Sequence, residues 1–265
     1  MKTHLYHLLT ALVLLLTIKS AKAQLANGPL QTYYSNDFNV NTGIAVLSGA
    51  ATHTNSVVQL TPDMTGKLGG LTVRSSNINS DKYRVSFTIG VNKLAGFGAD
   101  GLSYSFGDDA SARDSIPFAE AGTGTKLKIG FDSYTAAPSS QFGIRLLYNS
   151  TTSDPGVLAG SNGLLAFSSD VSWCGVGQVP VVVDIDSLGR LTLTVNGQTI
   201  FSNIQLPAAF TLADKSSWQH VFKARTGSLS QTHTVDDLII QQAMVPIIPT
   251  PPFIDKSFTF VGPSF

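Results

Sequence analysis

Residues 179–197, VPVVVDIDSLGRLTLTVNG, decide the fold class. Apolar and polar residues alternate on both sides of the turn Ser187-Leu188-Gly189, which is the period of a β-strand with one buried face. Asn196-Gly197 then separates the second run from a third, TIFSNI, and this dipeptide is the strongest short signal for a β-hairpin. Runs joined by such tight turns pair antiparallel, so the stretch predicts an antiparallel sheet.

Short β-rich runs bounded by Gly, Asn, Asp, Ser or Pro fill the rest of the chain, and no long segment keeps a capped helical period. Such runs continue over about 220 residues without a break in composition, which predicts one all-β sandwich domain. The runs cover residues 30–38, 82–91, 101–107, 126–134, 142–149, 220–225 and 235–242.

Both ends of the chain differ from this middle part. Residues 1–23 are predicted to be a signal peptide, because the apolar run 8–18 is too short to span a bilayer comfortably and Ala21-Lys22-Ala23 fits a cleavage site. The domain is expected over 24–245. Residues 246–265 continue a Pro-rich stretch and read as a stiff linker and the start of a possible further module. We therefore expect a secreted or cell-surface protein that does not span the membrane.

The charge and the cysteine content of the chain exclude some classes of binding partner and any internal disulfide. The net charge is zero, only 13% of the residues are charged, and no Lys/Arg cluster stands out, which argues against binding nucleic acid or an anionic membrane. Cys174 is the single cysteine, so no intramolecular disulfide is possible. We expect Cys174, beside Trp173, to be a packing residue, and both Trp173 and Trp218 to be buried.

Four motifs, in order, resemble the L-type lectins and the concanavalin A-like domains of bacterial surface proteins. The resemblance covers most of residues 30–242 and implies a concanavalin A-like antiparallel jelly-roll sandwich with its binding loops at one end of a curved sheet. The motifs are GADGLSYSFGDD (98–109), KLKIGFDSY (126–134), VPVVVDIDSLGRLTLTVNG (179–197) and FKARTGSLSQTHTVDDLII (222–240).

The resemblance implies a glycan site at the turn Ala99-Asp100-Gly101. Asp100 matches the aspartate that binds sugar hydroxyls in legume-type members, a role that suits a carboxylate because charge-assisted hydrogen bonds are strong. Gly101 would let the backbone approach the ligand. The alternative is that the tripeptide only turns the chain. The other candidate ligand-binding residues are Asp132, Tyr134, Arg225, Gly227 and Ser228.

The family also has a paired calcium and transition-metal site, and its ligands are mostly missing here. Gly130-Phe131-Asp132 stands where the family has Glu-Phe-Asp, the following loop has no carboxylate or carboxamide before Gln141, and Gln141 replaces the family's His. Only Asp132 remains, whereas calcium takes about six or more oxygen ligands. We therefore expect no metal cofactor.

Catalytic sites are disfavoured. Glycoside hydrolases of this fold need Glu-x-Asp-x-Glu, and Glu120 is the one glutamate of the chain. His233 with Asp236 and Asp237 suggests a relay, but no Gly-x-Ser-x-Gly elbow accompanies it, so we expect His233 to be structural. The protein is predicted not to be an enzyme.

Two acidic loops remain. Asp184, Asp186 and Gly189 imitate a calcium loop, but Val195 stands where its last ligand would be, so we expect a hairpin turn. Whether the loop with Asp108, Asp109 and Asp114 binds an ion or only turns the chain is left open.

These observations predict an exported, non-catalytic, lectin-like domain that binds glycans at the cell surface. The alternative is a structural or adhesion spacer of a larger surface protein, without sugar binding. A binder should expose Asp100 and Tyr134 together near Gly227, whereas a spacer should have these loops covered.

Overall fold

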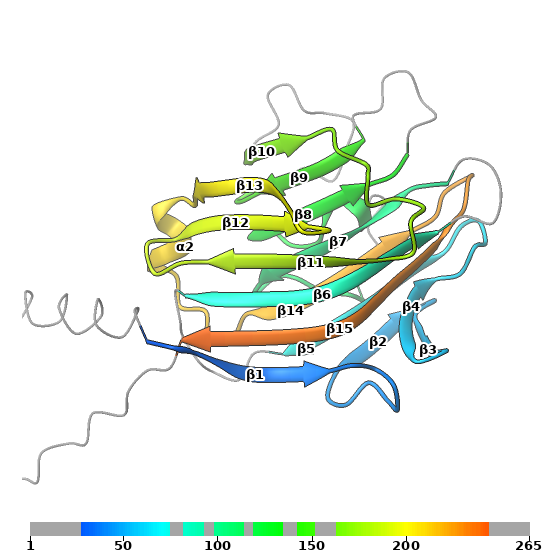
Figure 1. Cartoon of the computed structure of the whole chain (residues 1–265), viewed down its shortest axis with the longest axis horizontal. Coiled ribbons are helices and arrows are strands. Elements are labelled where there is room, and N and C mark those ends of the chain that lie inside the picture. The colour runs from blue at the N-terminus through cyan, green and yellow to red at the C-terminus, as the bar shows by residue number, and fades with distance from the viewer. Residues whose placement is uncertain are drawn as a thin grey trace, which may run out of the picture.

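The structure, a computed structural model, describes residues 28–74, 82–92, 98–113, 119–134, 142–151 and 163–243. These residues form two antiparallel β-sheets packed face to face (Figure 1), as the all-β prediction required. The first sheet has the order β13-β12-β11-β6-β15-β4-β3, with β1 paired to β15, and the second has the order β10-β9-β8-β7-β14-β5-β2. The predicted signal peptide and linker lie outside the described residues.

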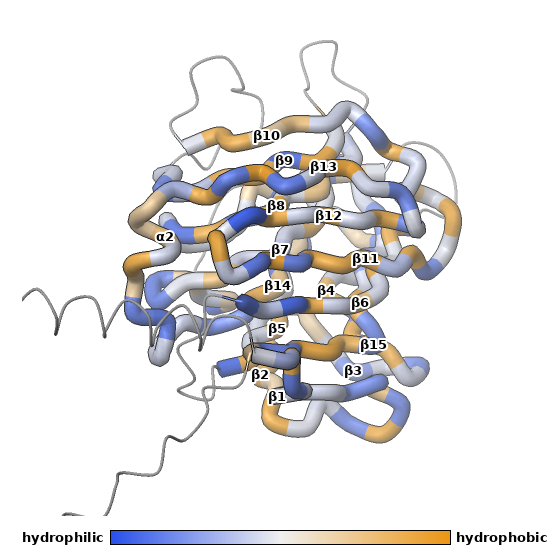
Figure 2. Tube along the Cα trace, turned by 60° about the vertical axis from the view of Figure 1, so that its left-hand side comes forward, coloured by the Kyte–Doolittle hydropathy of each residue, from blue (hydrophilic) through white to orange (hydrophobic). Residues whose placement is uncertain are grey.

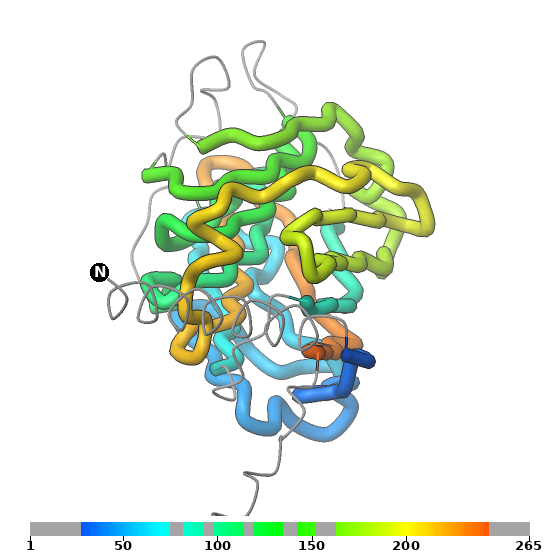
Figure 3. The backbone as a smooth tube through the Cα atoms, turned by 90° about the vertical axis from the view of Figure 1, so that its left-hand side faces the viewer, coloured from blue at the N-terminus to red at the C-terminus, as the bar shows by residue number. Residues whose placement is uncertain are grey.

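The strands of the first sheet are β1 (Leu30–Asn36), β3 (Thr52–Thr54), β4 (Val57–Thr61), β6 (Tyr83–Asn92), β11 (Gln178–Ile185), β12 (Arg190–Val195), β13 (Gln198–Gln205) and β15 (Thr232–Ala243). Those of the second sheet are β2 (Val46–Gly49), β5 (Leu68–Arg74), β7 (Gly101–Gly107), β8 (Leu127–Asp132), β9 (Gly143–Leu147), β10 (Leu164–Ser168) and β14 (Gln219–Arg225). Two short helices complete the elements: the 3-10 helix η1 (Ala119–Ala121) and α2 (Ala208–Leu212). Strands β1 and β15, far apart in sequence, lie side by side (Figure 3).

The first sheet has one buried and one solvated face, so its sequence alternates. Buried and less buried residues alternate along β11 and β12, and the alternation of hydropathy is visible along the chain (Figure 2). The predicted Asn196-Gly197 turn is present, with positive φ at both residues. In the preceding turn Asp186 Oδ1 accepts the backbone N–H groups of Leu188 and Arg190, each at 2.9 Å. The acidic residues there make a hairpin turn, as predicted.

The central strands β7, β8 and β9 of the second sheet are buried on both faces. The inner residues of β7, which are Leu102, Tyr104 and Phe106, belong to the core between the sheets. Its outer face is covered by residues 108–113 and 119–126, which follow β7. Ser103 Oγ donates to the carbonyl of Ala119 at 2.5 Å, for example. This cover buries polar residues that would otherwise face water.

The core is rich in aromatic side chains. Trp218 packs on Phe106 with ring centroids 5.0 Å apart, and Trp173 packs on Phe131 at 5.5 Å, so both tryptophans are buried as predicted. Cys174 is partly buried against the same core, which confirms its packing role. In the described part of the chain no helix is long and apolar enough to cross a membrane.

Candidate functional site

Three neighbouring strands of the second sheet bring the main candidate residues to one end of the sandwich. Asp100 directly precedes β7, Asp132 ends β8 and Arg225 ends β14. In the sheet register Gly101 faces Arg225 on one side and Asp132 on the other. Antiparallel pairing therefore places residues from three distant motifs in one row.

The backbone around Asp100 is held on both sides. The Ala99–Asp100 peptide bond is cis. The Asp100 N–H donates to the carbonyl of Arg225 at 3.1 Å, and its carbonyl accepts the N–H and Oγ–H of Ser133 at 2.9 and 3.1 Å. Gly101 has a φ of 149°, and a Cβ there would lie 2.1 Å from the Phe131 carbonyl oxygen. Close strand packing is thus sufficient reason for a glycine at this position.

The Asp100 side chain is paired but incompletely hydrogen-bonded. Its Oδ2 lies 3.1 Å from Arg225 Nη2, yet this buried oxygen accepts no hydrogen bond from the described residues, because the guanidinium N–H is not aligned with it. Burial raises the pKa of Asp100, while Arg225 opposes that rise. The residue is only 8% exposed, so its burial is the one expected of a spacer rather than of a binder.

Glu120 joins the site from η1, which the sequence did not reveal. Both of its carboxylate oxygens accept from Arg225: Oε1 from Nη2 at 2.8 Å and Oε2 from Nε at 3.2 Å. Glu120 is 1% exposed, and burial outweighs the Arg225 bonds and raises its pKa to about 7. A lone glutamate between two alanines was the available signal for a buried, paired carboxylate.

A second ion pair lies beside the first, from Asp132 to Arg145 of β9. Asp132 Oδ2 lies 3.1 Å from Arg145 Nη1, and Asp132 Oδ1 accepts the N–H of Tyr134 at 2.9 Å. Asp132 and Arg145 are 4% and 3% exposed. The guanidinium also lies 5.8 Å from the centre of the Phe167 ring. Arg145 too was missed, although a cation inside the apolar run GIRLL is a signal of a buried pair.

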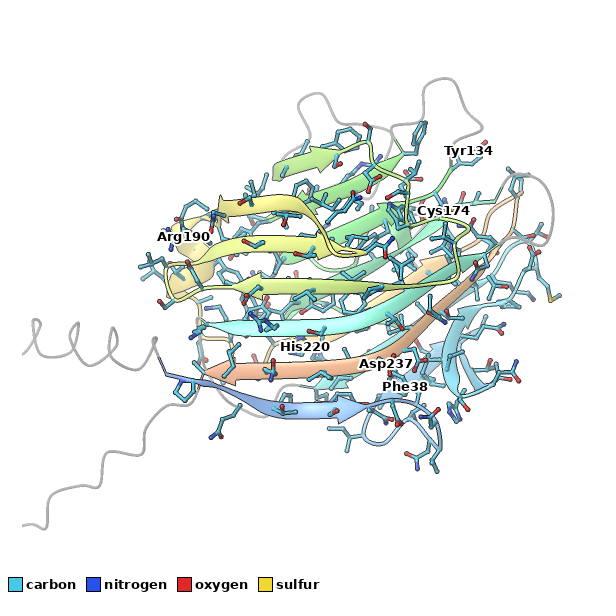
Figure 4. All side chains as sticks on the ribbon, in the orientation of Figure 1. Phe38, Tyr134, Cys174, Arg190, His220 and Asp237 are labelled. Atoms are coloured by element: carbon cyan, nitrogen blue, oxygen red, sulfur yellow. The ribbon has the colours of Figure 1, made fainter. Side chains whose placement is uncertain are left out.

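The remaining candidate ligand-binding residues differ in how closely they approach Asp100. A Cβ on Gly227 would lie 2.9 Å from Asp100 Oδ2, so this glycine packs directly on the carboxylate. Ser228 is exposed. Tyr134 is half-buried at the end of the molecule opposite Arg190 (Figure 4). Asp100, Arg225 and Gly227 are therefore in contact, whereas Tyr134 reaches the cluster through its backbone.

His233, the candidate for a catalytic relay, and the acidic loop with Asp108 and Asp109 both interact with neighbouring side chains of the fold. His233 is fully buried, with Nδ1 2.6 Å from Thr61 Oγ1 and Nε2 2.9 Å from Gln231 Nε2, and burial lowers its pKa to about 3. Asp109 Oδ2 accepts the N–H and the hydroxyl of Thr125 at 2.8 and 2.7 Å. Asp108 lies 4.0 Å from the Lys126 ammonium, and Asp114 lies outside the described residues.

The donor set does not fit the family's metal site. Across the described ranges no group of three or more His, Cys, Asp or Glu side chains is placed to hold a metal ion. Asp132, the remaining family ligand, has both oxygens engaged by Arg145 and Tyr134. Gln141 lies outside the described residues.

Comparison with known proteins gives a match in structure. No protein-family model matches the chain, and no curated protein matches it in sequence. The VIP36 exoplasmic/lumenal domain in its Ca²⁺/Man3GlcNAc-bound form superimposes with a TM-score of 0.62 at 18% identity, covering 83% of this chain and 92% of that one. The fold is that of the L-type lectins. The Emp47p carbohydrate recognition domain (TM-score 0.59, 14% identity, 81% and 97% covered) and lectin II from Ulex europaeus (0.58, 18%, 80% and 98%) agree. The predicted concanavalin A-like sandwich is thereby confirmed.

Proposed function

We propose that this protein binds carbohydrate without catalysis, at the sheet end that carries Asp100, Arg225 and Gly227. The observation that carries the proposal is the Asp100 carboxylate, which is fixed through its backbone, lies beside Gly227 and keeps 12% of its side-chain surface accessible. A carboxylate is an acceptor of hydrogen bonds, and sugar hydroxyls are donors that fit its accessible part.

The surroundings of Asp100 support a sugar rather than a cationic ligand. The Arg225 guanidinium lies 3.1 Å from the Asp100 carboxylate and would repel a second cation there. A neutral hydroxyl carries no such penalty and forms a charge-assisted hydrogen bond. Solved structures of the same fold include VIP36 with bound mannose and with Man3GlcNAc. The ligand has to reach a side chain that retains 12% of its accessible surface.

Hydrolysis of the bound sugar is not part of the proposal. A glycosidase needs one carboxyl group that donates a proton and a second carboxylate that acts as nucleophile or base. Both oxygens of Glu120 accept hydrogen bonds from Arg225, and both oxygens of Asp132 are engaged. Neither group is available for proton transfer to a substrate.

We further propose that the protein is exported and acts at the cell surface. The predicted signal peptide at 1–23 supports export, and the predicted linker at 246–265 supports attachment to a further module. The matched VIP36 structure is itself an exoplasmic/lumenal domain.

A spacer or adhesion module without sugar binding is the second candidate. It is favoured by the low exposure of Asp100 and Asp132, since a site filled by its own ion pairs needs no ligand. In that case Arg225 and Arg145 would serve only to hold the loops of the sheet end.

A glycan array of the purified protein separates the two candidates. Asp100→Ala removes the proposed contact, and Asp184→Ala removes a matched ion-paired aspartate whose oxygen lies 2.6 Å from Arg84 on the other sheet. We expect wild type and Asp184→Ala to bind the same glycans and Asp100→Ala to bind none. If folded wild-type protein binds no glycan, or if Asp100→Ala binds like wild type, the spacer is the better description.

A further inference from the structure

Three carboxylates buried at one end of a sheet require positive charge. Asp100, Glu120 and Asp132 are 8%, 1% and 4% exposed, and burial raises the pKa of each. An ionised carboxylate away from water is costly unless a cation and hydrogen bonds compensate it. In the described residues the cations that contact these three groups are two guanidinium ions, those of Arg225 and Arg145.

The two guanidinium ions form ion pairs with different carboxylates, although Arg225 also lowers the pKa of Asp132 from a greater distance. Arg225 Nη2 lies 2.8 Å from Glu120 Oε1 and 3.1 Å from Asp100 Oδ2, so Arg225 serves the two carboxylates on the β7 side. Asp132 has its hydrogen-bonded cation in Arg145, at 3.1 Å. The two ion pairs are therefore not interchangeable.

Arg145 is placed for Asp132. The side chain is buried, the Phe167 ring lies 5.8 Å from its guanidinium carbon, and its Nε and Nη2 have no hydrogen-bond partner in the part of the chain that the structure describes. A guanidinium carries five N–H donors, so this burial leaves several of them unused. The Arg145 guanidinium therefore contributes mainly its positive charge and its one hydrogen bond to Asp132.

A calcium ion does not fit the same place. Calcium takes six to eight oxygen ligands, while both Asp132 oxygens already accept hydrogen bonds and a cation there would lie against the Arg145 guanidinium. The VIP36 structures of this fold include Ca²⁺-bound and metal-free forms. In the present chain, by contrast, the cation beside Asp132 is the guanidinium of Arg145, a side chain of the protein itself.

The bond to Arg145 also connects to Asp100. Asp132 Oδ1 accepts the Tyr134 N–H, and Ser133, between them, donates its N–H and its hydroxyl to the Asp100 carbonyl. We infer that Arg145 takes the place of a metal ion at this site: its guanidinium neutralises Asp132 and holds the segment 132–134 that positions Asp100. Arg145 is thus a positioning residue, and the site is assembled without a divalent cation. The binding part of this inference rests on the proposed function, whereas the stability part does not.

A double-mutant cycle on the pair tests the inference. The variants are Arg145→Met, Asp132→Asn and the two combined, each measured for thermal unfolding with added Ca²⁺ and with chelator. Arg190→Met is the matched control, because Arg190 and Asp186 form a 2.6 Å ion pair that is less buried and lies at the end of the molecule opposite Tyr134 (Figure 4). Binding of any glycan found on the array is measured for the same set.

We expect the wild-type Tm to be the same in Ca²⁺ and in chelator. Arg145→Met, which leaves buried Asp132 without its ion-pair partner, should lower the Tm by about 5–15 °C, and the double variant should recover a large part of that loss. Arg190→Met should change little. Arg145→Met should also weaken glycan binding, with no rescue by Ca²⁺.

The outcomes separate this inference from the proposed function. A chelator that lowers the wild-type Tm or abolishes glycan binding overturns the inference while the lectin function stands. Arg145→Met as harmless as Arg190→Met overturns it as well. If no glycan binds but the double-mutant cycle shows the expected coupling, the proposed function fails, while the inference that Arg145 replaces a metal ion beside Asp132 stands.

Discussion

Replacing Arg225 by methionine should destabilise the protein through two buried carboxylates at once. The substitution removes the guanidinium that bonds both oxygens of Glu120 and lies 3.1 Å from Asp100 Oδ2. Removing one partner of a buried pair costs about 3–5 kcal/mol, and we take the lower end because the Arg225 side chain is 23% exposed. About 3 kcal/mol corresponds to a fall in Tm of about 6–12 °C for a domain of this size.

The loss of stability in Arg225→Met should depend on pH, and this dependence is the most specific test of the reasoning. The folded-state pKa of Glu120 already lies at about 7, above its ordinary value of 4.5, and loss of Arg225 moves it further upward. An ionised Glu120 therefore opposes folding above its ordinary pKa and ceases to do so once protonated at low pH. Thermal unfolding should show a larger loss for Arg225→Met at pH 8 than at pH 5. An equal loss at both pH values, or a loss no larger than that of Arg190→Met, would refute the reasoning.

Three further predictions concern neighbouring residues. Gly227→Ala places a Cβ 2.9 Å from Asp100 Oδ2, so we expect weaker glycan binding with little change in Tm, measured by titration calorimetry and thermal unfolding. In the wild type, stability should fall as pH rises from 4.5 to about 7, because the folded-state pKa of Glu120 is raised, and Glu120→Gln should remove this contribution, checked by urea unfolding across that range. Asp109→Ala removes the acceptor of two Thr125 donors and should cost about 1 kcal/mol, discounted for exposure, with no change in the effect of Ca²⁺ on Tm.

The hairpin strands β11 and β12 of the first sheet could be predicted well because their signals are local. The turns at Gly189 and Asn196-Gly197 follow from residue types that accept positive φ, and β11 and β12 alternate since only one face is buried. The alternation and the turn residues of this hairpin can be read from the local sequence alone.

Other strands were harder to recognise. The prediction did not identify β3 and β4 of the first sheet or β2, β5 and β10 of the second. Strand β5 in particular contains two glycines that lower strand propensity. A Cβ on Gly69 would lie 1.9 Å from the Leu60 carbonyl oxygen, so the glycine is there for close packing of β5 on the neighbouring chain. That requirement cannot be seen without the tertiary structure.

For the site, the sequence indicated the place but not the charge network. The nearness of Asp100 to Gly227 was expected from the resemblance to the L-type lectins, whereas the ion pair of Asp100 with Arg225 was not. The burial of Asp100 was not expected either, because the covering segment and Glu120 approach from η1, and Glu120 lies 105 positions from Arg225 in the chain. A pattern in sequence does not report ion pairs that only long-range packing creates.

A crystal structure of the protein with the strongest ligand from the glycan array tests the central claim most directly. We predict a sugar hydroxyl within hydrogen-bond distance of the Asp100 carboxylate, beside Gly227 and with the Asp132–Arg145 pair unchanged. A glycan bound on another face of the sandwich, with Asp100 still contacting only Arg225, would contradict the account.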